Sequence, residues 1–464
     1  MGHPTVYPTG TTILDPARSQ PGHTLFATGD RTVLIEPMGR EARTWRGLIG
    51  DPARPLPGGG VLGSTRRSGL ADPIREKADL VAVDWSGQVL WRRECRLGRD
   101  VEPARPGAPS QAVLLVEDRD VTDLDVSAKP LVDQSLVELN GAGHEVWRWN
   151  AHEHVAEFGF SETELNAICR RASDCPLIGG QGNWLAVSSA SRLGPNRHFD
   201  RGDARFHPDN ILFTARVANF VAVVSRATGQ VVFRLGPDFS SSPTGWLVGP
   251  THAGLIPAGL MGEGNLLVFD GGGDAGYGPA GGVAAQGLGV HRRDNARVVE
   301  VDPATGKVLW EYTPQTAGHI NPLDNYKFLS PDFGNAQRLA NGNTLINEGA
   351  NGRLFEVTDE GEVVWEYVNP YVSVDGRGLR STAVPRAYRV PFGWAPVPSP
   401  DVAAIVAPDV TRLRVPGAAA GWSGRRVAVP GVAPTDDRII GDPFRHRAQP
   451  SDEVSNFCIV NDGE

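Results

Sequence analysis

The stretch ARVVEVDPATGKVLW (residues 296–310) decides the fold, because its pattern occurs six times along the chain. Apolar residues alternate with polar ones, a turn follows, and the segment ends on an aromatic residue. The alternation predicts half-buried strands and the Asp, Thr and Gly cluster predicts a tight turn, so we expect a β-hairpin in each copy. The other five copies begin at Arg31, Asp79, Ser135, Asn219 and Gly352.

Each hairpin ends on an aromatic residue, and we expect these residues to occupy equivalent places: Trp45, Trp91, Trp147, Phe233, Trp310 and Trp365. Further strand-like stretches precede most copies, beginning at Pro57, Gln111, His207, Gly262 and Ala340. Two hairpins make a four-stranded sheet, and six such sheets predict an all-β fold, a six-bladed β-propeller with long inter-blade loops. Such loops on a rigid scaffold commonly carry function.

The composition fits a folded, turn-rich protein. The chain has 464 residues, 40% of them hydrophobic, and its 56 Gly and 37 Pro favour tight turns over long helices. A net charge of −9 argues against nucleic acid as a partner, and no apolar run reaches the roughly 18 residues of a membrane span. The start, MGHPTVYPTG, lacks a signal-peptide pattern. We therefore expect a periplasmic or secreted protein if a signal peptide was removed, and a cytoplasmic one otherwise.

The repeat pattern ends near residue 395. We divide the chain into a propeller, residues 1–395, and a C-terminal extension, residues 396–464, expected to pack on the propeller as a small β appendage. Its strand-like runs are TRLRV and RRVAV, and the final stretch SNFCIVNDGE is a candidate to complete a blade.

The four cysteines leave three arrangements open. Cys169 and Cys175 could form a short-loop disulfide in an exported protein. Cys95 and Cys458 could tie an early segment to the C-terminus. The alternative is four reduced thiols.

Two histidines, His152 and His154, open the insertion that follows Trp147. On an extended segment their side chains would point the same way, so the pair could hold a metal or flank an anion. The alternative is two exposed loop histidines. No third histidine lies at a recognisable metal spacing, and we expect neither a metal nor a cofactor.

Other polar residues lie where a predicted strand meets a loop. His252 stands in VGPTHAGLIPAG, Arg216 ends the strand NILFTAR, and His207 precedes a turn. A lone loop histidine is also compatible with a structural role. The Gly-rich run at residues 271–289 lacks the Lys-Ser/Thr of a phosphate loop, and we expect it to border the site as a lid. The sequence has no GxSxG motif, which gives a hydrolase triad little support.

The chain resembles the bacterial arylsulfotransferase family over roughly residues 5–395. The resemblance rests on the six hairpins together with YPTGTTILDP, NWLAVSSASRLGPN, HPDNILFTARVANFVAVVSRATGQVVFRLGPDF, THAGLIPAGLMGEGNLLVFDGGG, AQRLANGNTLINEGANGRLFEVTDEGEVVWEY and RAYRVPFGW. It implies a propeller of PQQ-like repeats that transfers a sulfuryl group from a phenolic sulfate to another phenol. In this family a channel histidine is transiently sulfated, and neither a metal nor a nucleotide sulfate donor takes part.

The resemblance also implies residue roles. His252 matches the family's nucleophile, with Thr251 as the alternative register, and Arg216 matches the sulfate-binding arginine. His152 and His154 match an Asn-Ala-His-x-His segment of the longer members.

The chain departs from the family at two places. Ala186-Val187-Ser188-Ser189 stands where members have His-x-Asn-Ser, and the stretch around Ala108 stands where they have a His-His-Asp entry. Two histidines and one asparagine of the family's sulfate site are therefore replaced.

Three hypotheses follow for the function. In an arylsulfotransferase-like enzyme, His252 attacks, Arg216 stabilises the transferred group, and His152, His154 or His207 carries protons. In a lyase, isomerase or hydrolase, His252 and the histidine pair act as acid and base. In a binding scaffold, the propeller has no catalytic role.

We expect the substrate to be an aromatic or anionic small molecule. Whether the protein forms a homodimer is left open by the sequence. The residues expected to contact the substrate are His207, Thr251, Ser188, Arg389 and Tyr388. His252, Arg216 and one of the paired histidines are expected to line one pocket at one mouth of the channel.

Overall fold

The computed structural model has two compact units, Met1–Val406 and Ala407–Glu464. It describes residues 9–65, 78–104, 112–122, 130–161, 164–165, 183–236, 244, 247–273, 293–374 and 380–405 of the first unit, and 425–428 and 457–460 of the second. The division falls after Val406, later than the boundary near residue 395 expected from the repeat pattern. Within the first unit, Ile405 pairs with Leu14.

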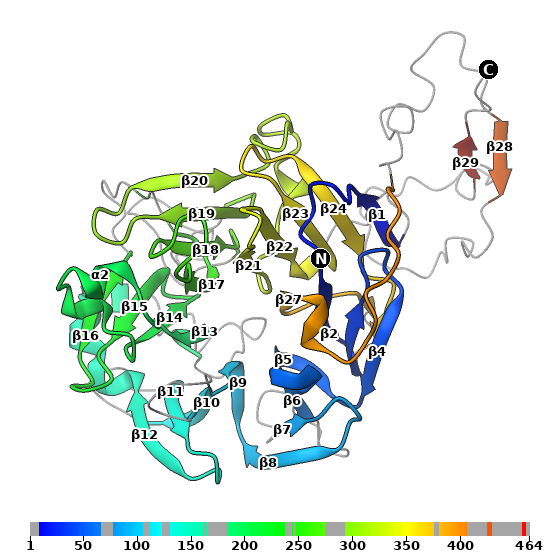
Figure 1. Cartoon of the computed structure of the whole chain (residues 1–464). Coiled ribbons are helices and arrows are strands. Elements are labelled where there is room, and N and C mark those ends of the chain that lie inside the picture. Colours follow the sequence, from blue (N-terminus) through cyan, green and yellow to red (C-terminus); the bar gives the residue numbers. More distant parts are fainter. Residues whose placement is uncertain are drawn as a thin grey trace, which may run out of the picture. The chain divides into compact units, whose positions relative to one another are not determined.

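The first unit is a ring of six antiparallel sheets, the blades of a β-propeller (Figure 1). From the innermost strand outward, blade 1 has β27 (Ala387–Val390), β2 (His23–Thr28), β3 (Arg31–Ile35) and β4 (Glu41–Arg46). Blade 2 has β5 (Ile49–Pro55), β6 (Val61–Thr65), β7 (Ala78–Val83) and β8 (Val89–Cys95). Blade 3 has β9 (Leu97–Glu102), β10 (Val113–Val121), β11 (Leu131–Leu139) and β12 (Glu145–Asn150).

The remaining three blades continue in chain order. Blade 4 has β13 (Val187–Arg192), β14 (Ile211–Ala215), β15 (Phe220–Val224) and β16 (Val231–Leu235). Blade 5 has β17 (Pro250–Leu255), β18 (Leu266–Asp270), β19 (Arg297–Val301) and β20 (Val308–Tyr312). Blade 6 has β21 (Asn335–Arg338), β22 (Thr344–Glu348), β23 (Arg353–Val357), β24 (Val363–Val368) and β1 (Gly10–Leu14).

Short elements lie in the segments outside these strands. They are a two-stranded ribbon of β25 (Ser373–Val374) and β26 (Arg380–Ser381), helix α2 (Arg197–Asp200), and the 3-10 turns η1 (Pro57–Gly59), η2 (Ala151–Phe158), η4 (Ala204–Phe206), η5 (Asn325–Lys327), η6 (Gly349–Asn351) and η7 (Phe392–Trp394).

Strands from both ends of the first unit close the ring. β27 is the innermost strand of blade 1, whose other strands come from the beginning of the chain. β1 pairs with β24 and becomes the outermost strand of blade 6. The middle strands are covered on both sides by neighbouring blades, which is why β15 is apolar and buried at all five positions instead of alternating.

Five of the six hairpin aromatics occupy equivalent places, as expected. Each pairs with the third-strand residue that precedes a β-bulge; Trp310 opposite Glu300 is one case. Trp45 does not, because Arg43 holds that place in blade 1 and Trp45 lies two residues further along β4. Trp45 instead corresponds to Trp149 in blade 3, so the expectation was wrong for this residue.

Indole N–H groups join neighbouring blades at the outer rim. Trp149 Nε1 donates to the Gly229 carbonyl in the outer turn of blade 4 at 2.8 Å. Trp365 Nε1 donates to the Pro37 carbonyl of blade 1 at 2.8 Å, across the closure of the ring. The repeated tryptophans therefore fix blade against blade, because each supplies both apolar area and a donor.

Buried Glu–Arg pairs join three of the blade interfaces. A glutamate opposite the hairpin aromatic accepts from an arginine on the inner strand of the next blade. The pairs are Glu138–Arg192 at 2.8 Å, Glu300–Arg338 at 2.5 Å and Glu356–Arg389 at 3.0 Å. Removing one partner of such a pair leaves a buried charge uncompensated, so these pairs fix the order of the blades.

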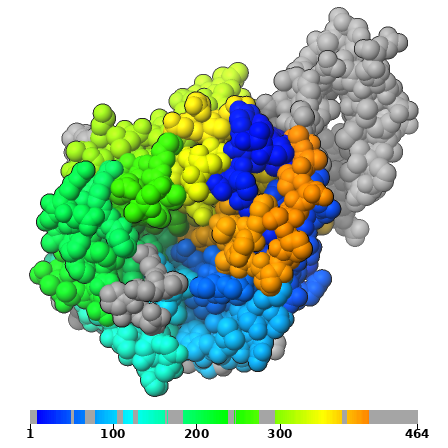
Figure 2. Space-filling view, viewed as in Figure 1, coloured from blue at the N-terminus to red at the C-terminus, as the bar shows by residue number. Residues whose placement is uncertain are grey.

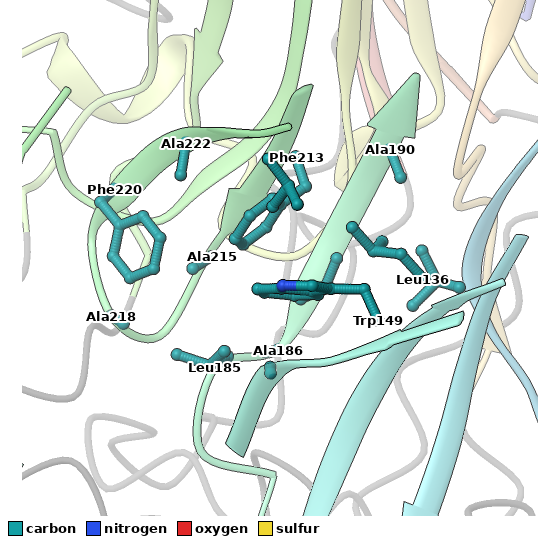
Figure 3. Close-up of a cluster of buried hydrophobic side chains, with 14 of the residues drawn as sticks. Leu136, Trp149, Leu185, Ala186, Ala190, Phe213, Ala215, Ala218, Phe220 and Ala222 are labelled. Atoms are coloured by element: carbon teal, nitrogen blue, oxygen red, sulfur yellow. The ribbon is translucent and has the colours of Figure 1, made fainter. Parts of the chain in front are cut away.

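An aromatic core fills the space between blades 3 and 4 (Figure 3). The Trp149 ring lies 5.4 Å from that of Phe213, which in turn lies 5.9 Å from Phe220. Ala186, directly before β13, and Ala190, within it, pack into the same cluster. The inner strand of blade 4 is thereby held against blade 3.

Most of the long connections lie at one end of the ring, where the inner strands begin, and we call this the entry end; the connection between β13 and β14 lies at the opposite end. Antiparallel pairing brings two kinds of connection there, from an outer strand to the next inner strand and from a second to a third strand. The segments between β12 and β13, β16 and β17, β18 and β19, and β20 and β21 all belong to this end.

The second unit contributes one described ribbon, in which β28 (Arg425–Ala428) pairs with β29 (Phe457–Val460). The RRVAV run is thus a strand, but the SNFCIV stretch pairs with it and does not complete a blade. Cys95 is a free, buried thiol, so it forms no bridge to Cys458. TRLRV, Cys169 and Cys175 lie outside the described residues. No helix in the described ranges is long and apolar enough to cross a membrane.

Candidate active site on the propeller axis

Side-chain oxygens on the inner strands hold each blade to the next. Asp100 Oδ2 accepts from the Ala190 N–H at 3.0 Å, Ser189 Oγ accepts from the Ala253 N–H at 3.2 Å, and Asn335 Oδ1 accepts from the Ala387 N–H at 3.0 Å. Inner-strand edges have N–H groups that no further strand can satisfy, and these side chains satisfy them. A polar side chain at this position of an inner strand therefore normally has a structural role.

His252 occupies the same place in blade 5 but forms no such bond. It pairs with Phe269, the next-to-last residue of β18, as Ser189 pairs with Thr214 and Asn335 with Asn347. Its Nδ1 is buried without a hydrogen-bond partner among the described residues. Because the default structural role is not filled, His252 is the inner-strand residue best suited to a chemical one.

Burial and nearby charge keep the His252 imidazole neutral. Desolvation lowers its pKa well below the usual 6.5, and the positive charges of Arg386 and Arg54 lower the pKa further. A neutral imidazole has a free lone pair on one ring nitrogen, which a nucleophile or base requires.

Arg386 is the residue just before β27, and its side chain reaches the inner strands of other blades near the axis. Its Nη1 donates to the Gly334 carbonyl of the segment leading into blade 6 at 2.7 Å. Its Nη2 donates to the carbonyls of Ser188 in blade 4 and Thr251 in blade 5, at 2.5 and 2.8 Å. One buried guanidinium thus joins four blades beside His252.

A second guanidinium lies next to it on blade 2. Arg54 Nη2 donates to both oxygens of Asp100, at 2.9 and 2.8 Å, and the guanidinium carbon lies 4.9 Å from the ring centre of Tyr388. Burial raises the pKa of Tyr388 to about 12, so its hydroxyl is a neutral donor. We call Arg54, Asp100, His252, Arg386 and Tyr388 the axial cluster.

A strap of chain, residues 330–334, reaches from blade 6 over the entry end. The Arg99 side chain of blade 3 donates to the Asp332 carbonyl at 2.8 Å, and its guanidinium lies 5.3 Å from the Phe333 ring. Arg216 of blade 4, itself buried, lies 3.2 Å from the Asp332 carboxylate. The strap is therefore held by blades on the opposite side of the ring. Figure 2 shows a hollow between the blades near the centre of the ring.

Three of the sequence-predicted contact residues lie at the axial cluster. Ser188 and Thr251 are buried and present carbonyls to Arg386. The Thr251 hydroxyl donates to the Gly334 carbonyl at 3.1 Å, so it is already used inside the protein. Tyr388 belongs to the cluster itself.

The histidine pair lies elsewhere, and the expected extended geometry was wrong. His152 and His154 lie in the 3-10 turn η2, so their rings take different directions. His152 Nδ1 lies 2.7 Å from Asp133 Oδ2, whereas His154 Nδ1 lies 2.7 Å from Glu157 Oε1 and its ring stacks on Trp149. No hydrogen bond, ion pair or ring contact in the described part of the chain connects either one with His252.

Two further candidates are also outside the cluster. His207 is exposed, packs edge-on against Phe199 and lies on the connection between β13 and β14, at the end of the ring opposite Arg216. Arg389 is buried between Glu356 and the Trp365 ring, at 3.0 Å and 4.5 Å respectively, as part of the blade 6 to blade 1 interface. Its role in the fold is structural.

The sequence did not single out Arg386, Arg54, Asp100 or Asp332. Arg386 stands in the RAYRV motif, and its position directly before an inner strand was the available signal. The Gly-rich run 271–289 lies almost wholly outside the described residues. No group of three or more His, Cys, Asp or Glu that could hold a metal occurs in the ranges that the structure describes.

Comparison with known proteins gives one family match. Residues 284–370 match the family model described as arylsulfotransferase (ASST), a segment that covers β19 to β24 and does not include His252. No curated protein matches the chain.

Solved structures resemble this chain in fold alone. They include a protein of unknown function from Bacteroides caccae, 13% identical, with a TM-score of 0.42 over 79% of this chain and 98% of that one. Virginiamycin B lyase from Staphylococcus aureus is 10% identical, with a TM-score of 0.34 over 80% and 91%. The propeller domain of Cps50 from Myceliophteria thermophila is 11% identical, with a TM-score of 0.36 over 81% and 91%.

Proposed function

We propose that this chain, a member of the arylsulfotransferase family, transfers a sulfuryl group from an aryl sulfate to a phenol through a transiently sulfated His252. The observation that carries the proposal is the neutral His252 imidazole, whose Nδ1 is buried without a partner among the described residues and which lies beside two guanidinium groups. A nucleophile for sulfur needs a free lone pair, and the transferred group needs positive charge around its oxygens.

The reaction proceeds in two displacements. In the first, a ring nitrogen of His252 attacks sulfur, the bond from sulfur to the aryl oxygen breaks, and the phenolate leaves with the electron pair. In the second, the acceptor phenol's oxygen attacks the same sulfur and the N–S bond breaks. The acceptor's proton passes to water or to the released phenolate, and His252 returns to its neutral form.

Arg54 and Arg386 stabilise the charge that develops on the sulfuryl oxygens. Asp100 fixes Arg54 through two hydrogen bonds, and the three blade carbonyls fix Arg386. Such preorganised donors are each worth about 2.7–4 kcal/mol in a transition state. They take the place of the two histidines and the asparagine that this chain lacks relative to the family pattern.

Release of 4-nitrophenolate from 4-nitrophenyl sulfate, with phenol as the acceptor, tests the proposal. We expect turnover that depends on phenol and double-reciprocal plots that stay parallel as phenol is varied, because two separate displacements share one enzyme form. His252→Ala is expected to lower kcat by at least about 1,000-fold, as loss of a nucleophile does. His207→Ala is the matched control, since that histidine is exposed at the other end of blade 4, and it should retain full activity. Absence of turnover in the parent protein with a panel of aryl sulfates contradicts the proposal.

A further inference from the structure

We infer that the axial cluster selects esters that carry a single negative charge, so that it binds aryl sulfates and rejects doubly charged aryl phosphates, and that Arg386 and Asp100 set this selectivity. The inference rests on the proposed function for the kind of ester, but it concerns recognition of charge and not transfer of the group.

The first step is the unbalanced charge of Arg386. The residue is 4% exposed, and its four hydrogen-bond acceptors are all main-chain carbonyls, those of Gly334, Pro385, Ser188 and Thr251. No carboxylate pairs with it in the described ranges. A buried cation normally has an anionic partner, because removing its hydration is costly.

The second step is that the neighbouring charges cancel. Asp100 neutralises Arg54, and His252 is neutral. Next to Arg54, Glu102 belongs to a four-membered network in which two carboxylates balance two guanidinium groups; its members are Glu102, Glu138, Arg192 and Arg226. Arg216 is matched by Asp332 at the entry end. The axial cluster therefore carries one net positive charge.

The third step is the chemistry of the atoms that lack a partner. The hydroxyl of Tyr388, which is 8% exposed, and the Nε atoms of Arg54 and Arg386 are buried without a hydrogen-bond acceptor among the described residues. All three can donate, and burial of such groups without an acceptor is costly. Donors of this kind are suited to a compact group with several acceptor oxygens, which describes a sulfate or phosphate ester.

Charge then separates these two esters, which have nearly the same shape. A sulfate ester has one negative charge at all pH values above 2 or so, and it neutralises the cluster. A phosphate ester acquires its second charge above a pKa of about 6, and its binding would leave one excess negative charge in a poorly solvated site. Charge repulsion is weakly screened there, so the second charge is disfavoured.

Binding to the His252→Ala protein tests the inference without turnover. Isothermal titration calorimetry compares phenyl sulfate with phenyl phosphate, whose second pKa is about 6, at pH 8 and at pH 5. We expect the sulfate to bind at least about tenfold more tightly at pH 8, and the difference to close at pH 5, where the phosphate has lost its second charge. The sulfate's charge does not change over this range, so it corrects for any change in the protein. Equal affinities at pH 8, or a difference that is the same at both pH values, overturn the inference.

Two substitutions locate the selectivity. Asp100→Asn adds one net positive charge and keeps an oxygen for the Ala190 N–H; it should shift the affinity ratio at pH 8 toward the phosphate by tenfold or more. Arg386→Gln should abolish binding of both esters, whereas Arg205→Gln, which removes an exposed arginine paired with Asp203, should leave both unchanged. An unchanged ratio in folded Asp100→Asn protein overturns the inference. If that variant does not fold, the pH comparison decides. Selective binding without any turnover in the parent protein would reject the proposed function and leave this inference standing.

Discussion

His252 is the residue from which the chemistry starts, and its pH dependence follows from its surroundings. Because burial and two guanidinium groups lower the pKa of His252 well below 6.5, the imidazole stays neutral across pH 6 to 8. Protonation would remove the lone pair, so activity is lost only as the pH falls through the lowered pKa. The profile of kcat/KM with 4-nitrophenyl sulfate, whose own charge is constant, should be flat from pH 6 to 8 and decline in acid. A decline centred near 6.5 would show an ordinary, solvated histidine instead.

Single residues were partly accessible from the sequence. His252 could be proposed because it precedes a predicted inner strand and matches a family motif. Arg54, Asp100 and Arg386 could not, because their partners lie in other blades: Arg386 bonds Ser188, 198 positions away in the chain. The prediction for His152 and His154 failed for a local reason. It assumed an extended segment, whereas these residues lie in the 3-10 turn η2.

Arg389 belongs to one of the Glu–Arg pairs that join neighbouring blades. Arg389→Ala leaves the buried Glu356 carboxylate without its partner, so it should destabilise the fold by about 3–5 kcal/mol while kcat stays within a factor of two. Denaturant unfolding and turnover of the same preparation measure both. The double variant Arg389→Met with Glu356→Leu should recover most of the loss, because it leaves no buried charge. A large fall in kcat with unchanged stability would restore the substrate-binding role expected from the sequence.

The strap at residues 330–334 is the second element with a testable consequence. Asp332 places a carboxylate, 54% exposed, on Arg216 at the entry end, where it competes with an incoming anion. Because solvent screens this half-exposed carboxylate, we expect the pair to contribute as little as a surface pair does, about 0.2–1 kcal/mol. Asp332→Asn should therefore lower KM for an aryl sulfate by up to about fivefold and leave kcat unchanged.

Asp401→Asn, an exposed carboxylate far along the chain from the strap, is the control in the same assay. A KM that rises in Asp332→Asn would mean that the carboxylate orders the site and does not compete with the substrate.

The whole molecule depends on strands from both ends of the first unit. A chain that ends after Val406 should keep the melting temperature and activity of the full chain, because the second unit is compact by itself. A chain that ends after Pro385 loses β27 together with Arg386 and Tyr388, so blade 1 has no inner strand and the ring stays open. We expect that chain to be unfolded by circular dichroism. A cooperative melt at the parental temperature would contradict the closure described here.

The ring of six blades was predictable because each hairpin can be recognised within about fifteen residues, from alternating apolar residues, a turn and a terminal aromatic residue. The closure of the ring was less predictable. The pairing of β1 with β24 joins Gly10 to Val368, and no local sequence pattern indicates a contact between residues so far apart. Trp45 shows the same limit on a small scale, because the strand register that puts Arg43 in the equivalent place of blade 1 is visible only in the structure.

The central claim is that His252 carries the sulfuryl group between donor and acceptor. Intact-protein mass spectrometry after mixing with 4-nitrophenyl sulfate alone, at neutral to alkaline pH, tests it most directly. The account predicts a mass increase of one SO₃ group, located on His252 by peptide mapping, absent in His252→Ala and lost again when phenol is added. Turnover with no modified enzyme at any time, or a sulfuryl group on another residue, would contradict it.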